Sequence, residues 1–199
     1  MNLRKIGVIT VAILCIFLFM NFSFASTVDI TEDGEFKDIE EIIDDNPGDT
    51  YIYLNNHTFV GDGQQLDINK DNITIDGSIN PDSGGTGDEM STIDADSLSR
   101  VMEIRSDSVI LKNLIITNGF IGIDEDDARG AAAIIRGTDI TFINCIIMNC
   151  EVLSNHAQAT ATIHIASSDS CIVNLINSTL CNNRVNTTGL DTSEGTSAR

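Results

Sequence analysis

The segment LKNLIITNGF, residues 111–120, decides how this chain folds, because similar segments return as FINCIIMNCE (142–151) and LINSTLCNNR (175–184). Each copy contains an Asn, four intervening residues and a second Asn: Asn113 and Asn118, Asn144 and Asn149, Asn177 and Asn182. The first Asn of each copy follows the previous one after 31 and then 33 residues. A repeat of this length is typical of a solenoid, in which each coil stacks on its neighbours.

The apolar residues around the first Asn alternate at a period of two, which indicates β-strands with one buried face. They stand two and four positions before this Asn, as Leu111 and Val109 do, and one and three positions after it, as Leu114 and Ile116 do. The alternation changes phase at the Asn. We therefore predict that two short strands meet at a corner there, and that both send alternate side chains inward.

The same phase places both Asn residues of each copy on the inward side. A buried amide must find hydrogen-bond partners. Coils stacked at the strand spacing of ~4.8 Å would let each Asn bond its equivalent in the next coil. We interpret the pairs as a structural Asn ladder and not as a repeated ligand site, with the members Asn113, Asn118, Asn144, Asn149, Asn177 and Asn182.

A third strand precedes each pair, at Met102–Ile104, Ala133–Ile135 and Ile163–Ile165. The turns RSDS (105–108) and RGTD (136–139) follow the first two. Three strands per turn predict an all-β fold, a parallel β-helix of about four coils. The earliest coil is the degenerate NITIDG (72–77), in which Gly77 takes the place of the Asn.

The remaining segments give the expected organisation of the chain. Residues 26–60 should form an N-terminal cap, with a short helix over Phe36, Ile39, Ile42 and Ile43 that NPGD ends, followed by one strand over 50–60. The coils should occupy residues 61–186, with loops at 77–90, 118–130 and 151–161 that are available for binding. Residues 187–199 form a polar tail without a recognisable cap, which we interpret as the end of a partial chain.

Residues 1–25 have the pattern of a secretory signal peptide: Arg4 and Lys5, an apolar run from Ile6 to Met20, and the small-residue end SFAS. We expect cleavage after Ala25 and a secreted or cell-surface protein; the alternative is an uncleaved anchor as the one contact with a membrane. Without this segment, 9 basic and 30 acidic residues remain, a net charge near −21. Such a balance argues against nucleic acid as a partner.

Several segments together resemble the β-helix repeats of adhesin-like surface proteins, which are abundant in methanogenic archaea. They are FKDIEEIIDDNPGDTYIYLNN, NITIDG, DSVILKNLIITNGF and TDITFINCIIMNC, with the paired Asn, and the resemblance covers residues 30–185. It implies a right-handed parallel β-helix of the pectin-lyase-like kind and contact with glycans or other cells. The further coils and the anchoring modules usual in such proteins are not found in this sequence.

Right-handed β-helices also include polysaccharide lyases and hydrolases, so an enzyme remnant is the main alternative, and a structural envelope protein is a third. The weak candidates for Ca²⁺ are Asp124, Asp126 and Asp127, which lack the EF-hand arrangement and also fit a solvated acidic loop. Arg105 and Arg136 recur at the same position of successive coils, which favours a role in packing the turns over a role in a single catalytic site. The three His residues have no Ser or Cys partner that the sequence reveals. We predict no catalytic residue and no cofactor.

Four cysteines follow the signal segment: Cys145, Cys150, Cys171 and Cys181. An exported chain could join them in two disulfides with three connectivities, or bury them as thiols. Their spacing lacks the close pairs of a zinc site. Candidate N-glycosylation sites are Asn56, Asn72 and Asn186. The alternation places the Asn177 side chain inside the stack, which argues against glycosylation at that sequon.

Overall fold

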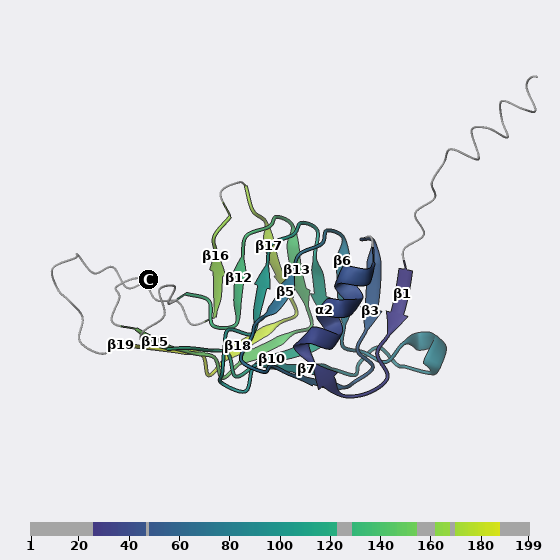
Figure 1. The fold of residues 1–199 in the computed structure, drawn as a ribbon, viewed down its shortest axis with the longest axis horizontal. Coiled ribbons are helices and arrows are strands. Elements are labelled where there is room, and N and C mark those ends of the chain that lie inside the picture. The colour runs from purple at the N-terminus through teal and green to yellow at the C-terminus, as the bar shows by residue number, and fades with distance from the viewer. Residues whose placement is uncertain (1–25, 47, 123–128, 155–161, 168–169, 188–199) are drawn as a thin grey trace, which may run out of the picture.

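A computed structural model describes residues 26–46, 48–122, 129–154, 162–167 and 170–187. Its strands form four sheets in which every described pairing is parallel (Figure 1). Sheet A has six strands in the order β1 (Ser26–Asp29), β3 (Thr50–Tyr53), β6 (Ile73–Asp76), β9 (Ile110–Lys112), β13 (Ile140–Ile143) and β17 (Val173–Ile176). Sheet B has six in the order β2 (Gly34–Glu35), β4 (Thr58–Val60), β7 (Ser91–Asp94), β10 (Leu114–Thr117), β14 (Ile146–Met148) and β18 (Thr179–Cys181).

The two other sheets complete the coils. Sheet C has the order β5 (Leu66–Ile68), β8 (Met102–Ile104), β12 (Ala133–Ile135) and β16 (Ile163–Ile165). Sheet D has the order β11 (Phe120–Ile121), β15 (Glu151–Ser154) and β19 (Arg184–Thr187), and it extends to one side of the stack. The chain passes from sheet A to sheet B and on to sheet C before it returns to sheet A. In the coils that contain β11 and β15, it passes through sheet D between sheets B and C. The predicted parallel β-helix is therefore confirmed, and the three predicted third strands are β8, β12 and β16.

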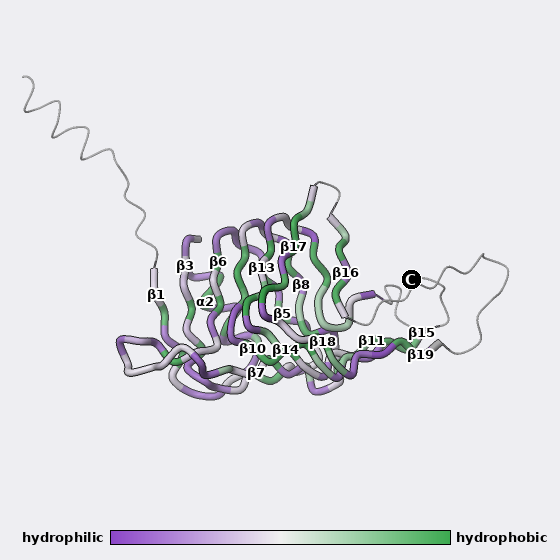
Figure 2. Tube along the Cα trace, turned by 180° about the vertical axis from the view of Figure 1, so that it is seen from behind, coloured by the Kyte–Doolittle hydropathy of each residue, from purple (hydrophilic) through white to green (hydrophobic). Residues whose placement is uncertain are grey.

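The core consists of inward side chains stacked from coil to coil. Ile75, Leu111 and Phe142 are register neighbours in sheet A, and all three are buried. Hydrophobic stretches are visible along the stacked strands in Figure 2. Stacking of equivalent apolar residues in successive coils gives the solenoid one continuous core.

The first coil contains a helix where later coils have a sheet C strand. Helix α2 (Phe36–Asp45) follows β2, packs against β5 and buries Phe36, Ile39 and Ile43. Its N-terminus is held by Asp38, whose Oδ2 accepts the Glu35 N–H at 2.7 Å. Glu40 Oε1 accepts the N–H of Asp67 in β5 at 2.7 Å. A helix side chain thus satisfies a backbone donor on the edge strand of sheet C.

The structure corrects three expectations. Residues 50–60 form two strands, β3 and β4, because Asn55 and Asn56 adopt φ values of 50° and 62° and turn the chain between them. These strands, with β1 and β2, extend sheets A and B to six strands, whereas sheet C has four. The predicted loops 118–130 and 151–161 begin with the strands β11 and β15, and the loop 77–90 contains the short 3₁₀ helix η1 (Pro81–Ser83).

The predicted signal peptide (1–25) and the tail from 188 onward lie outside the described residues. Within the described ranges, no helix has the length and apolar composition that a membrane crossing requires.

Candidate functional site

The first Asn of each repeat forms a hydrogen-bonded column along the corner between sheets A and B. All six repeat Asn have φ between 49° and 57°, in the left-handed region that Asn tolerates better than most residues. Asn177 Nδ2 donates to Asn144 Oδ1 at 3.3 Å, and Asn144 Nδ2 donates to Asn113 Oδ1 at 2.8 Å. Asn113 Nδ2 donates in turn to Asp76 Oδ1 at 2.8 Å. The column thus ends on a carboxylate.

Asp76 is 1% exposed and receives further donors. Tyr51 Oη donates to its Oδ2 at 2.5 Å, and Lys112 Nζ lies 2.8 Å from the same oxygen. Burial alone would raise the pKa of Asp76, but these bonds and those from Ser78 and Asn113 hold it below its ordinary value. A Cβ on Gly77 would lie 1.9 Å from the Asn113 carbonyl oxygen of the next coil. The degenerate coil thus needs glycine at that position.

The second Asn of each repeat behaves differently. Asn118 Nδ2 donates to Asp94 Oδ1 at 2.9 Å, so this corner also has a carboxylate partner. Asn149 and Asn182 are exposed and not buried as predicted, because the chain continues from this corner into the laterally extending sheet D. Asn177 is exposed as well, since β17 is the last strand of sheet A.

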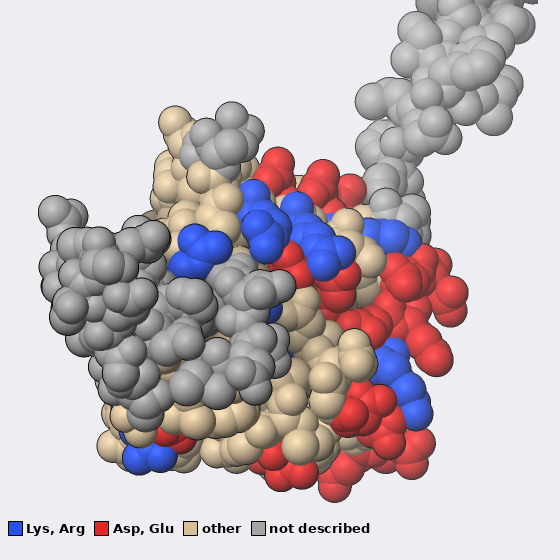
Figure 3. Space-filling model, turned by 60° about the vertical axis from the view of Figure 1, so that its left-hand side comes forward, with Lys and Arg blue, Asp and Glu red and all other residues tan. Residues whose placement is uncertain are grey.

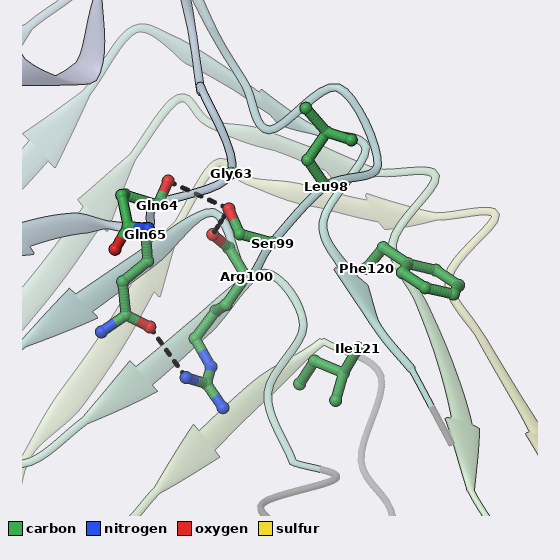
Figure 4. Close-up of a pocket in the computed structure, with 8 residues that line it drawn as sticks. All are labelled: Gly63, Gln64, Gln65, Leu98, Ser99, Arg100, Phe120 and Ile121. Carbon is green, nitrogen blue, oxygen red and sulfur yellow. Dashed lines mark hydrogen bonds between the residues drawn. The ribbon is translucent and has the colours of Figure 1, made fainter. Parts of the chain in front are cut away.

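A cavity with a candidate functional role lies at the corner between sheets B and C. It has a volume of about 230 Å³ and takes its lining from three successive coils: Gly63, Gln64, Gln65, Leu98, Ser99, Arg100, Phe120 and Ile121. Figure 4 shows the polar side chains on one side and the apolar ones on the other. We call this cavity the corner pocket.

Backbone geometry brings the three segments together. Gly63 has a φ of 97°, and Asp96 and Ser97 have φ values of 50° and 59°, so both lower coils turn sharply before sheet C. The Phe120 N–H donates to the Ser99 carbonyl at 2.8 Å, which fixes the third segment on the second. Ser99 Oγ has two acceptors within reach, the Gln64 carbonyl at 3.0 Å and the Arg100 carbonyl at 2.9 Å.

Arg100 ties the pocket wall to the coils above and below it. Its Nη1 donates to Gln65 Oε1 at 2.8 Å, its Nε to the Gly130 carbonyl at 2.9 Å and its Nη2 to the Arg129 carbonyl at 3.0 Å. Each guanidinium nitrogen is thus engaged within the protein. Arg100 therefore supports the wall and is poorly placed to bind an anion.

A charged network continues from the pocket onto the outer face of sheet C. Gln65 Nε2 donates to Glu103 Oε2 at 2.5 Å, Arg105 Nη2 donates to the same oxygen at 2.8 Å, and Arg136 Nε donates to Oε1 at 2.6 Å. The bond from Arg105 is the main reason why the pKa of Glu103 falls to about 2. The recurring Arg105 and Arg136 thus hold one carboxylate, in keeping with a packing role.

Asp67 lies beside Glu103 in the register of sheet C. Burial raises the pKa of Asp67, although Arg105 Nη1 lies 3.1 Å from its Oδ2. Its Oδ1 is buried without a hydrogen-bond partner in the described structure. The two neighbouring carboxylates thus have pKa values shifted in opposite directions.

The other candidate residues from the sequence are dispersed. Asp124, Asp126 and Asp127 lie outside the described residues, and the described part of the chain contains no group of three or more potential metal ligands. All four cysteines are free thiols; burial raises the pKa of Cys145 and Cys150 to about 11. The candidate glycosylation sites Asn56, Asn72 and Asn186 are all exposed.

Sequence reasoning missed the corner pocket because its lining comes from three coils and forms no contiguous motif. Two signals were available. Leu98 and Phe120 are large apolar residues in segments that the strand pattern leaves unexplained.

Comparison with protein-family models, curated proteins and solved structures gave no significant match for this chain.

Proposed function

We propose that this chain is an exported, adhesin-like cell-surface β-helix protein that binds neutral glycans at the corner pocket without cleaving them. The observation that carries the proposal is the division of the pocket into a polar wall with Gln64 and Gln65 and an apolar wall with Leu98 and Phe120. A sugar ring presents hydroxyl groups at its edge and C–H groups on its faces. Planar amides and an aromatic ring are complementary to those two surfaces.

Charge favours a neutral ligand. The chain has a formal net charge of −19, so an anionic polysaccharide would be repelled over most of the surface. Arg100, the cation of the pocket, is engaged with Gln65 and with two backbone carbonyls. Export is supported by the signal-like pattern of residues 1–25.

Binding can be tested on an array of neutral and acidic glycans, followed by calorimetric titration of the best neutral ligand. We expect Phe120→Ala to weaken binding about tenfold, a loss of about 1.4 kcal/mol. Gln64→Ala should weaken it as well. Val60→Ala changes an exposed apolar residue of β4 that does not line the pocket and should bind as the wild type does. Equal affinity of the Phe120 and Val60 variants would refute the pocket as the site.

A polysaccharide hydrolase is the second candidate function, and the Asp67–Glu103 pair favours it. Neighbouring strands lie ~4.8 Å apart, close to the separation of about 5–5.5 Å between the carboxyl groups of retaining glycosidases. The raised pKa of Asp67 suits an acid and the lowered pKa of Glu103 suits a nucleophile. However, the Glu103 side chain is only 7% exposed, and both its oxygens accept hydrogen bonds.

Turnover assays on neutral polysaccharides and on polygalacturonate, with and without calcium, separate the two functions. We expect no release of sugars. Cleavage that Asp67→Asn abolishes would establish the enzyme instead. Absence of both cleavage and glycan or cell binding would favour a structural envelope protein.

A further inference from the structure

Of the two amide side chains in the polar wall of the corner pocket, one is engaged and one is available. Gln65 Nε2 donates to Glu103 Oε2 at 2.5 Å, and Gln65 Oε1 accepts from Arg100 Nη1 at 2.8 Å, which fixes this amide at both ends. Gln64 is exposed, and its side-chain amide makes no hydrogen bond to any residue that the structure describes. Gln64 therefore offers a ligand both an N–H donor and a carbonyl acceptor.

Ser99 adds an acceptor beside this amide. Its Oγ has two carbonyl oxygens within reach, that of Gln64 at 3.0 Å and that of Arg100 at 2.9 Å, so its one proton stays within the protein. The lone pairs of the hydroxyl oxygen are left for a donor on the ligand. The polar wall thus suits a ligand group that contains both a carbonyl oxygen and an N–H.

An unusual turn presents Leu98 at the pocket. Asp96 and Ser97 have φ values of 50° and 59°, a left-handed conformation that Asp tolerates but that is uncommon for Ser. The turn closes where the Leu98 N–H donates to the Ala95 carbonyl at 2.9 Å. The Leu98 side chain is 59% exposed, the highest fraction among the large hydrophobic residues that are exposed in the described structure. Backbone strain clusters at ligand sites, and here it holds an apolar side chain in water.

The cavity has room for one sugar residue. Its volume of about 230 Å³ lies below the ~300–1,000 Å³ of pockets that take drug-sized ligands. Leu98, Phe120 and Ile121 face the polar wall across this space (Figure 4). A plain hexose presents hydroxyl groups and the C–H groups of its ring, which suit Phe120 but provide no apolar group for Leu98. An acetamido group adds one methyl group, one carbonyl oxygen and one N–H.

We propose that the corner pocket recognises one N-acetylated sugar residue, a 2-acetamido-hexose within a neutral glycan. The methyl group packs on Leu98 while the ring lies on Phe120. The acetamido carbonyl accepts from Gln64 Nε2, and the acetamido N–H donates to Ser99 Oγ. The group is uncharged, which agrees with the engagement of all three Arg100 guanidinium nitrogens within the protein. This inference rests on the proposed glycan binding and adds the class of sugar.

Calorimetric titration of the full chain with matched oligosaccharides tests the proposal. The probes are N-acetylated, plain and free-amine hexose oligomers of equal length, each in the gluco and the galacto series. We expect the acetylated oligomer of one series to bind about tenfold or more tightly than its plain counterpart, the discrimination that one additional apolar group gives. The free-amine oligomer is a cation, and acidic side chains gather on one side of the molecule (Figure 3). Its binding should therefore disappear when NaCl is added.

Two variants locate the preference in the pocket. Leu98→Ala removes the partner of the methyl group and, since Leu98 is exposed, should leave the fold intact. We expect it to reduce the preference for the acetylated oligomer about fourfold or more, the effect of roughly one buried CH₂, with little change in the affinity for the plain oligomer. Gln64→Ala should reduce the preference as well. Val60→Ala is the matched control outside the pocket and should keep it in full.

The outcomes separate this inference from the function on which it rests. Equal affinity for the acetylated and the plain oligomers would overturn the inference and leave glycan binding intact. So would a preference that both variants leave unchanged, or tighter binding of the free-amine oligomer that persists in salt. Binding of none of the oligomers would refute the proposed function together with the inference. Circular dichroism of each variant shows whether it is folded.

Discussion

At the corners formed by Asn113, Asn144 and Asn177 between sheets A and B, the backbone enters the left-handed region, and the Asn side chain extends along the stack to the coil below. Most residues with a Cβ pay roughly 1–2 kcal/mol for this conformation, whereas Asn adopts it routinely. The amide then donates to the previous coil and accepts from the next, as Asn144 does between Asn113 and Asn177. The sequence repeat therefore has the length of one coil, because each of these coils needs an Asn at the same corner.

We expect Asn144→Ala to lower the free energy of unfolding by about 1–3 kcal/mol, because it leaves Asn113 Oδ1 without its donor and strains the left-handed corner. Urea unfolding followed by circular dichroism measures this loss. Asn144→Gly relieves the backbone but still removes the amide, so it should recover only part of the stability. Asn174→Ala removes an exposed amide of the same sheet and should change stability by less than about 0.5 kcal/mol. Equal stability of the Ala variant and the wild type would contradict a stabilising ladder.

The carboxylate of Asp76 should make stability depend on pH. Its pKa is lower in the folded chain than its ordinary value of 3.8, so its ionised form stabilises the fold. This contribution is present above the ordinary pKa and is lost as the pH falls through the folded pKa. We therefore expect Asp76→Asn to be less stable than the wild type at neutral pH. The difference between the two should shrink as the pH falls below 3.8.

Urea midpoints of both proteins across this pH range give the measurement. Asp82→Asn changes an exposed carboxylate in η1 and serves as the control. A difference between wild type and Asp76→Asn that stayed constant with pH would show that lost packing, and not the charge, is responsible.

Among the elements, helix α2 has an unusual position, because it replaces a strand and lies against the edge of sheet C. Glu40 contributes the acceptor for the Asp67 N–H. We expect Glu40→Ala to destabilise the chain by about 1–2 kcal/mol, since a bond to a charged acceptor is lost. Glu40→Gln keeps an oxygen at the same place and should retain most of the stability. Glu41→Ala, on the exposed side of the helix, should behave as the wild type in thermal unfolding. Equal melting temperatures of the Glu40→Ala and Glu41→Ala variants would show that the hydrogen bond between Glu40 and Asp67 does not contribute to stability.

The elements that carry the Asn repeat were predictable, and those without it were not. The phase change at Asn113, Asn144 and Asn177 located six strands, and the apolar pairs before them located three more. The strand over 50–60 was wrong because the Asn55–Asn56 turn resembles a continuous polar stretch in an extended segment. Sheet D escaped prediction since β11 has only two residues and β15 follows an exposed corner.

The candidate site depends on arrangement across coils, which explains why sequence reasoning did not find it. Gln65 and Arg100 are 35 positions apart, yet their side chains bond directly. The alternation rule predicts whether a strand residue faces inward or outward. It does not predict which corner residues of different coils meet, because that depends on turn lengths and left-handed residues such as Ser97.

The acidic excess should govern how the molecule responds to ions. With a formal net charge of −19, the folded chain repels itself, and salt screens that repulsion within a Debye length of about 10 Å at 0.1 M. We therefore expect the melting temperature to rise as NaCl is added from low ionic strength. CaCl₂ and MgCl₂ at equal concentration should raise it to the same extent, because screening does not distinguish them. Differential scanning calorimetry provides the comparison. A larger rise with calcium that Asp126→Asn removes would instead place a specific calcium site in the acidic loop.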